Sequence, residues 1–422
     1  MRLFAAFAIA KFLRFLTRLR GGGSAFPGFV LLRLVPDALE RAVGSLPRGV
    51  IFVTGSNGKS TTTAMLTEIL RAHGLRVFSN PAGGNLPQGL ASALVGGASL
   101  LGRVAADIAV LEVDEAYGPP ISDLVAPDWV VITNIQVDQL NRFGEPEAVY
   151  RLLLTLGHRA KAGVVINGSD PNTTALGAEL HATGTRVEQM QVSSAAQATA
   201  AHGLVPAPLF FDPPPNLAVA PGVVVSAVRG PQTSLDVGGA VWKVTLPQPG
   251  LHYAVDAGLA MEMASVVLQD FQPERAVAAL ELGAGVYGRG EVIRYRGVEI
   301  SLIMMKNLPS LQVNLDAFPA PLENVFIAVD EGTPDPSWIF DADTRSLASV
   351  SVLSGSKAWQ WALLLEHRGI PYGEVIEDSR AGLDAFIKNS PPQGGPLHAI
   401  VNYEQMMLIR RIAGYKELEG AR

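Results

Sequence analysis

The segment Thr54–Thr63 combines glycine, lysine and hydroxyl residues in a spacing that can hold phosphate groups. It reads TGSNGKSTTT and follows an apolar run, Gly49–Val53, that predicts a strand. A glycine turn between a strand and a helix directs backbone N–H groups and the positive end of the helix at an anion. Lys59 would contact the β and γ phosphates, and the Ser60 hydroxyl would help to hold Mg²⁺. The spacing is the shorter GxxGKS, because Val53 stands where GxxxxGK[ST] has glycine.

Three acidic residues close a second apolar run, DIAVLEV at 107–113, and they are Glu112, Asp114 and Glu115. Strand ends of a parallel sheet line the ligand crevice, where an acid can coordinate Mg²⁺ on ATP. We assign Glu112 a metal or catalytic role, and the alternative is an acidic surface turn. Polar residues that include Asn134 follow a third run, Asp128–Ile135. The three loops together predict a site that uses ATP.

The elements that must position these loops alternate between apolar runs and helical patterns. Such alternation predicts an α/β fold, with a P-loop-containing, mostly parallel sheet in a central domain at 47–284. Within it, residues from about 190 to 245 are rich in Ala, Pro, Gly and Val and predict an insertion of short strands and loops. A second, smaller Rossmann-like α/β domain is expected at 285–422, and residues 1–46 form an N-terminal helical segment.

Residues 1–20, MRLFAAFAIAKFLRFLTRLR, predict an amphipathic basic helix. Lys11, Arg14 and Arg18 share one helical face, whereas Phe12, Phe15, Leu16 and Leu19 share another. Leu3–Ala10 is too short an apolar run to span a bilayer, which needs about 20 residues. Three interpretations stay open: contact with an anionic membrane surface, packing on this protein or a partner, and a signal peptide.

The composition excludes several classes of function. The 422 residues carry 33 Lys and Arg against 39 Asp and Glu, and this net charge of −6 argues against a general nucleic-acid binder. Cysteine is absent, which excludes disulfides, thiol nucleophiles and Cys-ligated zinc. The seven His are scattered without an HxxxH pair, so no zinc site is expected. Hydrophobic residues at 48% supply more than one core.

The phosphate loop resembles the TGTNGKTTT loop of the Mur ligase family, whose members activate a carboxylate with ATP as an acyl phosphate that an amine then attacks. Later stretches resemble one branch of the family, the MurT subunits of lipid II isoglutaminyl synthase. These stretches are LEVDEA, ITNIQVDQLNRFGE, VINGSDP, YGRGEVI, MMKN, DPSWIFDAD and SGSKAW. The resemblance covers nearly the whole chain apart from about 190–245.

The resemblance implies an ATP-dependent carbon–nitrogen ligase of peptidoglycan synthesis. Its substrate would be lipid II, whose stem-peptide D-glutamate carboxylate would be phosphorylated and then amidated to D-isoglutamine. The ammonia would come from a GatD-type glutaminase docked on the C-terminal domain. ATP and Mg²⁺ are the implied cofactors. The implied location is the cytoplasm or the inner face of the cell membrane, where residues 1–20 would make a peripheral contact.

The resemblance also implies roles for individual residues. The nucleotide-binding set is Thr54, Gly55, Ser56, Asn57, Gly58, Lys59, Ser60, Thr61, Asn134 and Arg289. The metal set is Ser60 and Glu112, and the catalytic set is Lys59, Glu112 and Asp335. Asp335 would orient the histidine of the partner's Cys–His pair, since a carboxylate can fix an imidazole tautomer. The alternative for Asp335 is a cap of the turn beside Pro336. Lys306 and Asn307 match a KN motif of the family.

The chain departs from the family at several positions. Its lack of cysteine removes the zinc ribbon of MurT proteins, so the insertion must hold together by apolar packing. Asn141 replaces an Asp, and Tyr253 and Asp256 replace two Asn, which changes the available donors and acceptors. Two other functions stay open: a Mur-type or folylpolyglutamate-type ligase that adds an amino acid directly, and a non-catalytic scaffold. DPSW and SGSKAW favour the amidating ligase subunit, and the intact loop argues against the scaffold.

Overall fold

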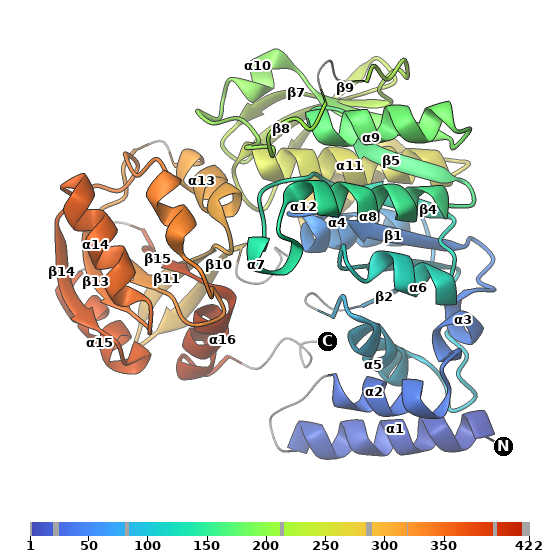
Figure 1. Ribbon diagram of the computed structural model, residues 1–422, viewed down its shortest axis with the longest axis horizontal. Coiled ribbons are helices and arrows are strands. Elements are labelled where there is room, and N and C mark those ends of the chain that lie inside the picture. The colour runs from blue at the N-terminus through green and yellow to red at the C-terminus, as the bar shows by residue number, and fades with distance from the viewer. Residues whose placement is uncertain are drawn as a thin grey trace.

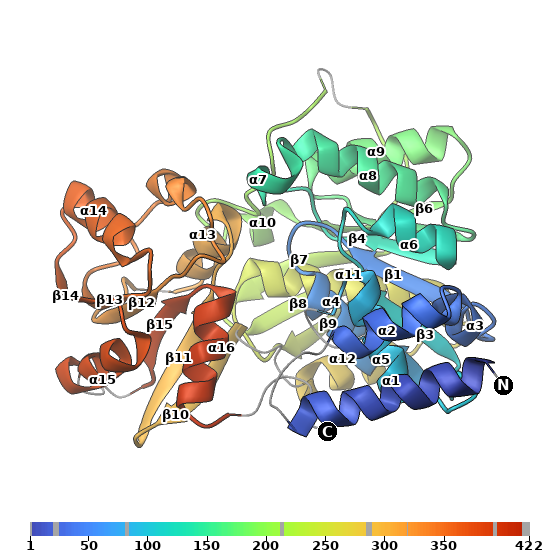
Figure 2. The same ribbon diagram turned by 60° about the horizontal axis from the view of Figure 1, so that its bottom comes forward.

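The computed structural model describes residues 2–19, 25–80, 84–211, 215–283, 289–318, 320–390 and 395–415. Two sheets organise these residues, one of nine strands and one of six. Figures 1 and 2 show the two sheets as separate bodies that lie beside each other, joined by the chain that follows α12. The predicted α/β class, with a large mostly parallel sheet and a second, smaller sheet domain, is confirmed.

The nine-stranded sheet has the order β2-β3-β1-β4-β5-β6-β7-β8-β9. Its strands are β1 (Val50–Thr54), β2 (Val77–Ser79), β3 (Ile108–Glu112), β4 (Trp129–Ile132), β5 (Gly163–Asn167), β6 (Val187–Val192), β7 (Val223–Arg229), β8 (Gln232–Val237) and β9 (Ala240–Thr245). Neighbours from β2 to β7 are parallel, and β8 and β9 continue antiparallel. The insertion therefore does not form a body of its own, because its strands extend the main sheet.

Helices cover both faces of this sheet. The helices of this half of the molecule are α1 (Arg2–Leu19), α2 (Phe26–Leu34), α3 (Ala38–Val43), α4 (Lys59–Ala72), α5 (Pro87–Gly97), α6 (Gly118–Leu124), α7 (Leu140–Phe143), α8 (Pro146–His158), α9 (Pro171–Ala182), α10 (Ser194–Gln197), α11 (Leu251–Val267) and α12 (Pro273–Leu282). Val50 and Phe52 of β1 belong to one core, whereas Ile51 and Val53 belong to the other. Burial on both faces explains why these strands read as uninterrupted apolar runs.

The N-terminal helices pack into the first of these cores. Gly28 of α2 lies against α5, and a Cβ at this position would approach the Gln88 carbonyl oxygen to 2.0 Å. The Gly28 N–H donates to Ser92 Oγ at 2.9 Å across this contact. α1 joins the same core through Ala6, Phe7 and Ala10. Among the described residues, no helix is long and apolar enough to cross a membrane.

The six-stranded sheet has the order β10-β11-β15-β12-β13-β14, antiparallel between β10 and β11 and parallel elsewhere. Its strands are β10 (Arg289–Tyr295), β11 (Val298–Met304), β12 (Val325–Ala328), β13 (Val350–Ser354), β14 (Tyr372–Ile376) and β15 (Leu397–Val401). Its helices are α13 (Leu308–Asp316), the 3₁₀ helix η1 (Ser337–Asp341), α14 (Ala358–Arg368), α15 (Ser379–Asn389) and α16 (Tyr403–Ile412). β14, at the edge of this sheet, is half-exposed and has no continuous apolar run.

Candidate functional site

The phosphate loop lies between β1 and α4, at the carboxyl end of the central sheet. Gly55 and Gly58 have φ angles of 122° and 83°, which side chains with a Cβ rarely adopt. A Cβ on Gly55 would lie 2.3 Å from Thr133 Oγ1, and a Cβ on Gly58 would lie 2.2 Å from Asp256 Oδ1. Both glycines are therefore required by conformation and by space, because a side chain at either position would meet Thr133 or Asp256.

Residues that follow β4 hold the loop in place. Asn134 Oδ1 accepts from the Asn57 N–H at 2.9 Å, and Thr133 Oγ1 donates to the Asn57 carbonyl at 2.6 Å. The Gln136 side chain accepts from Asn57 Nδ2 at 2.6 Å. Asn134, predicted as a nucleotide-site residue, is thus a brace of the loop that also lines the adjacent cavity.

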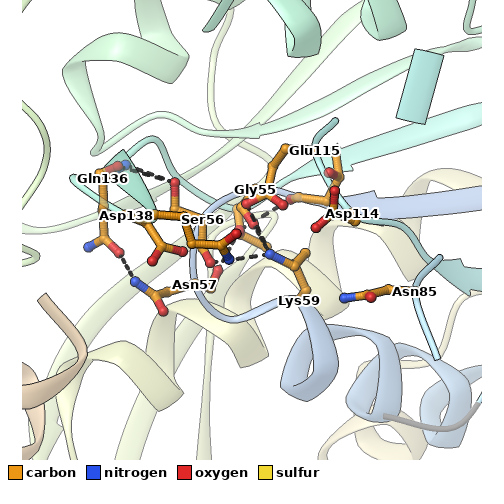
Figure 3. A network of polar contacts seen from close by, with 12 residues as sticks. Gly55, Ser56, Asn57, Lys59, Asn85, Asp114, Glu115, Gln136 and Asp138 are labelled. Carbon is orange, nitrogen blue, oxygen red and sulfur yellow. Dashed lines mark hydrogen bonds and ion pairs between the residues drawn. The ribbon is translucent and has the colours of Figure 1, made fainter. Parts of the chain in front are cut away.

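Lys59 begins α4 and folds its side chain back over the loop. Its Nζ donates to the Gly55 carbonyl at 2.6 Å, to the Ser56 carbonyl at 3.2 Å and to Glu115 Oε1 at 3.0 Å, as Figure 3 shows. Lys59 is 7% exposed. Burial alone would lower the pKa of Lys59, but the carboxylates of Glu115, Asp138 and Glu112 outweigh it and raise this pKa. The lysine is therefore a fixed buried cation where a phosphate would enter.

Glu115 is the acid that contacts Lys59. It is 1% exposed, and its Oε2 is buried without a hydrogen-bond partner among the described residues. Burial raises the pKa of Glu115, although the charge of Lys59 opposes this. Glu112, the acid that the sequence favoured, ends β3 and accepts from Asn85 Nδ2 at 3.1 Å. Glu112 acts on Lys59 through its charge, without a direct hydrogen bond.

A divalent cation fits the donors at this position. A buried carboxylate oxygen without a partner is a ligand that Mg²⁺ accepts, and Mg²⁺ usually takes one or two carboxylates together with phosphate oxygens. Glu115 supplies such an oxygen, and Ser60 lies in the first turn of α4. Within the described ranges no three His, Asp or Glu side chains cluster as a metal site. The donors therefore suit a metal that arrives with a nucleotide.

Asp114, which lies between Glu112 and Glu115 in the sequence, is paired with an arginine. Asp114 forms two hydrogen bonds with the Arg142 guanidinium, at 2.8 and 2.6 Å. Burial would raise the pKa of Asp114, but the hydrogen bonds from Arg142 and the charge of Lys59 lower it below its ordinary value. Arg142 also lies over the rings of Tyr117 and Phe143. Asp114 therefore anchors α7 beside the site.

Two side chains of the C-terminal domain reach the phosphate loop. Lys306 Nζ donates to the Ser56 carbonyl at 2.7 Å and pairs with Asp138 Oδ2 at the same distance. Asn307 caps α13 and accepts from Asn57 Nδ2 at 3.4 Å. The KN motif thus brings a second cation to the loop, and it does so across the domain boundary.

A cavity that is partly open to solvent lies between the two domains. Its lining combines the phosphate loop, the start of α11 and α13, through residues that include Asn57, Asn134, Tyr253, Asp256, Lys306 and Asn314. Asp256 accepts from Thr62 Oγ1 at 3.3 Å and lies against Gly58. Two of the three departures from the family, Tyr253 and Asp256, therefore line this cavity, whereas Asn141 is exposed on α7.

The remaining predicted residues lie in different surroundings. Thr54 and Thr61 are buried in the loop, and Ser60 is half-buried. Arg289 begins β10, and its side chain lies outside the described part of the chain. Asp335 is exposed on the C-terminal domain and is not among the residues that line the cavity. Its Oδ1 accepts from the Ser337 N–H at 2.9 Å, which lowers the pKa of Asp335 and makes it a turn cap.

Sequence reasoning missed Glu115, Asp138 and Gln136 as parts of this site. The signal for Glu115 was present, because three acids stand together after β3. A turn after the strand brings the third of these acids back to Lys59, and only the path of the backbone decides this. Asp138 and Gln136 follow β4 in the stretch ITNIQVDQ, where polar residues at a strand end were already a signal.

Residues 53–205 match the model of the Mur ligase middle domain. Over these residues the central domain resembles the middle domain of Mur ligases. This match contains β1, the phosphate loop, the acids after β3 and the residues after β4, so the braces and charges described above all lie within it. It also agrees with the family that the sequence motifs resemble.

Curated relatives resemble the central domain in sequence. The MurT subunit of lipid II isoglutaminyl synthase (glutamine-hydrolysing) of Streptococcus pneumoniae is 38% identical over 152 residues, 36% of this chain and 33% of that protein. The UDP-N-acetylmuramate–L-alanine ligase of Thermobifida fusca is 28% identical over 294 residues, 69% of this chain and 55% of that protein. The matched region thus spans about a third of the length of the MurT relative.

Solved structures share the fold over most of the chain. MurF from Acinetobacter baumannii matches with a TM-score of 0.67 and 18% identity, covering 91% of this chain and 79% of that one. MurF ligase from Thermotoga maritima, solved in complex with ADP, matches with a TM-score of 0.64 and 17% identity, covering 93% and 84%. These likenesses extend beyond residues 53–205 to the six-stranded sheet and establish the fold.

Proposed function

We propose that this protein is the ligase subunit of a glutamine-dependent amidating enzyme that uses ATP to convert the D-glutamate carboxylate of the lipid II stem peptide into D-isoglutamine. The observation that carries the proposal is Lys59, a buried cation that folds over a glycine loop beside Glu115. The similarity to MurT subunits supports the amidating reaction and the lipid II substrate.

The proposed reaction has two steps. An oxygen of the substrate carboxylate attacks the γ phosphorus of ATP, the bond from this phosphorus to the bridging oxygen breaks, and ADP leaves. Ammonia then attacks the acyl carbon, gives up a proton, and phosphate leaves with the former carboxylate oxygen. Lys59 would exchange the carbonyl oxygens of Gly55 and Ser56 for phosphate oxygens, and the fixed N–H groups of the loop would stabilise the transferring phosphoryl group.

Mg²⁺ would neutralise charge on the phosphate oxygens. Ser60 and the acids after β3 would hold it, Glu112 as the sequence predicts and Glu115 as its unpartnered Oε2 favours. Lys306 reaches the same loop from the C-terminal domain, so its cation could balance the incoming phosphates when it leaves Asp138. The chain's own residues thus supply two cations and two acids around one anion site.

The ammonia would come from a GatD-type glutaminase docked on the C-terminal domain. Asp335 is exposed there, as a residue that acts on a partner must be. Its carboxylate would orient the partner's histidine, a positioning role in which it would share its oxygens with the hydrogen bonds from Ser337. We place the protein in the cytoplasm, at the inner face of the membrane that carries the lipid-linked substrate.

The test uses the full chain, purified with its candidate glutaminase, and lipid II in detergent with ATP and Mg²⁺. We expect conversion of one carboxyl to an amide, seen by mass spectrometry, with glutamine plus the partner or with ammonium alone. Lack of amide product with either nitrogen source, from folded protein that binds ADP, would overturn the proposal.

The same assay separates the amidating ligase from one that adds an amino acid directly. Mixtures of amino acids replace ammonium and glutamine in a parallel reaction. A product heavier by an amino-acid residue would favour the Mur-type or folylpolyglutamate-type reaction. Absence of nucleotide binding by calorimetry would instead favour a scaffold.

A further inference from the structure

α1 presents a continuous apolar face to solvent. Its large exposed side chains are Phe4, Ile9, Phe12, Phe15, Leu16 and Leu19, and Phe12 and Phe15 are 61% and 60% exposed. Positions separated by three, four or seven residues share one side of a helix, so these side chains form a single stripe along α1. Monomeric proteins rarely expose large contiguous apolar patches, and those that occur usually mark binding surfaces.

The opposite face of α1 packs on the central domain, which leaves the apolar stripe facing solvent. Ala6, Phe7 and Ala10 are buried against the core of the central domain. Lys11 Nζ donates to the Val95 carbonyl at 2.9 Å, at the carboxyl end of α5, where a cation is favoured by the helix dipole. Figure 2 shows α1 along the outer edge of the molecule, with α2 and α5 behind it. The helix is thus docked firmly on one side and uncovered on the other.

α2 adds aromatic groups to the same end of the molecule. Phe26 and Phe29 are half exposed, three residues apart on one side of this helix. Together with the stripe on α1 they define an apolar end surface, formed by the exposed side chains of α1 and α2. Phenylalanine and leucine dominate this surface, as they do in helices that lie in the boundary between lipid headgroups and acyl chains.

Basic residues predominate around the end surface, although the carboxylate of Asp37 lies close enough to Arg2 for their charges to interact. Residues 1–36 contain six basic and no acidic residues, although the whole chain carries a net charge of −6. Arg2 at the start of α1 and Arg33 near the end of α2 are exposed. Basic groups beside an apolar helix face add attraction to an anionic lipid surface.

We propose that the end surface docks the protein on an anionic membrane, with α1 lying parallel to the bilayer plane and its phenylalanine side chains inserted at the headgroup boundary. This surface is a separate feature from the phosphate loop, and the proposal does not depend on the ligase reaction. A second copy of the chain is a poorer occupant, because a twofold contact would bring two basic surfaces together.

Vesicle flotation of the full chain tests the proposal without nucleotide or substrate. The probes are vesicles of phosphatidylcholine alone and vesicles of phosphatidylcholine with phosphatidylglycerol. We expect the protein to float with the anionic vesicles, to float weakly with the neutral ones, and to bind less as salt rises. Phe12→Glu should lower the bound fraction about tenfold or more, because it places a charge in the apolar stripe.

The matched control is Leu363→Glu on α14, a position that is 62% exposed and far from α1 along the chain. It should float like the unchanged protein, and both variants should keep the unchanged melting temperature. Absence of flotation with anionic vesicles, or equal flotation of Phe12→Glu, would overturn the proposal. A dimer in light scattering that Phe12→Glu converts to a monomer would also overturn it, in favour of a second copy as the occupant.

Discussion

Each domain contains a lysine–glutamate ion pair with nearly the same N–O distance, but the two pairs differ in their exposure to solvent. In the central domain Lys59 Nζ lies 3.0 Å from Glu115, and both side chains are buried. In the C-terminal domain Lys357 Nζ lies 2.9 Å from Glu331, whose side chain is 72% exposed. Burying a charge pair carries a desolvation cost that its attraction often fails to offset, so a buried pair is weak evidence for a stabilising role.

The difference in burial distinguishes an ion pair in a candidate binding site from an ion pair at the surface. Around Lys59 the carbonyl groups of the loop and three acids fix the cation in one place, as an electrostatic site requires before its ligand arrives. The Lys357 side chain is 14% exposed, but water can replace its exposed partner Glu331 at little cost. The C-terminal domain contributes to the central site through Lys306, while its own predicted acid, Asp335, faces solvent.

The largest expected effect comes from Lys59→Ala. Loss of the cation removes the contact to the phosphates, so we expect the ATP-dependent rate to fall about a thousandfold. Because Glu115 then lacks its partner in a buried place, the melting temperature should also fall. Lys357→Ala is the matched control, and it should change neither the rate nor the melting temperature. A rate near that of the unchanged protein in Lys59→Ala would remove the phosphate-loop assignment.

The acids after β3 sharpen the comparison inside the central domain. Glu115→Gln should raise the Mg²⁺ concentration that gives half the maximal rate by roughly ten- to a hundredfold. The substitution replaces the carboxylate oxygen that has no other partner. Glu112→Gln should have the smaller effect, since Glu112 acts on Lys59 only through its charge. Titration of the rate with Mg²⁺ for both variants measures the difference. The reverse order would restore Glu112 as the principal metal residue.

Asp335→Asn tests whether the C-terminal surface serves a partner. We expect glutamine-driven amidation to fall about tenfold or more, because an amide cannot stabilise a partner's imidazolium as a carboxylate does. Amidation driven by free ammonium should stay unchanged, since Asp335 lies outside the cavity. Product formation with each nitrogen source gives the ratio. Equal losses with both sources would show that Asp335 serves the ligase site or the fold instead.

Glu262 on α11 offers a buried acid outside the site for comparison. Burial raises the pKa of Glu262 to about 8, well above its ordinary value of 4.5. The folded state therefore holds a proton that the unfolded chain loses, and the free energy of unfolding should fall as pH rises from about 5 to 8, by at most about 1.4 kcal/mol per pH unit. Denaturant unfolding of Glu262→Gln should show a weaker fall. An unchanged slope would mean that Glu262 is ionised in the folded protein.

The phosphate loop could be located from sequence because its signals are local. The apolar run of β1, the two glycines and the Lys-Ser pair lie within about a dozen residues, and each constrains the backbone or the chemistry by itself. The choice between Glu112 and Glu115 could not be made in this way. Both follow the same strand, and the direction of the turn after it decides which acid meets Lys59.

Contacts between distant segments were beyond the sequence. The pair of Lys306 with Asp138 joins residues 168 positions apart, on two domains, and no local pattern links them. The same holds for α1, for which the sequence left packing and membrane contact as alternatives. The structure shows that α1 packs on the central domain through Ala6, Phe7 and Ala10 and leaves the opposite stripe exposed. Packing on this protein is therefore compatible with contact between the exposed stripe and a membrane.

By itself the sequence determined the α/β class, the glycine turn between β1 and α4 and the amphipathic character of the first helix, because backbone preference and hydrophobic periodicity act over a few residues. Tertiary structure decided which acid opposes Lys59, which cation crosses from the second domain and which side of α1 is left exposed. These depend on how the chain closes long loops and on which surfaces exclude water. Both are properties of the assembled fold and have no counterpart in a short stretch of sequence.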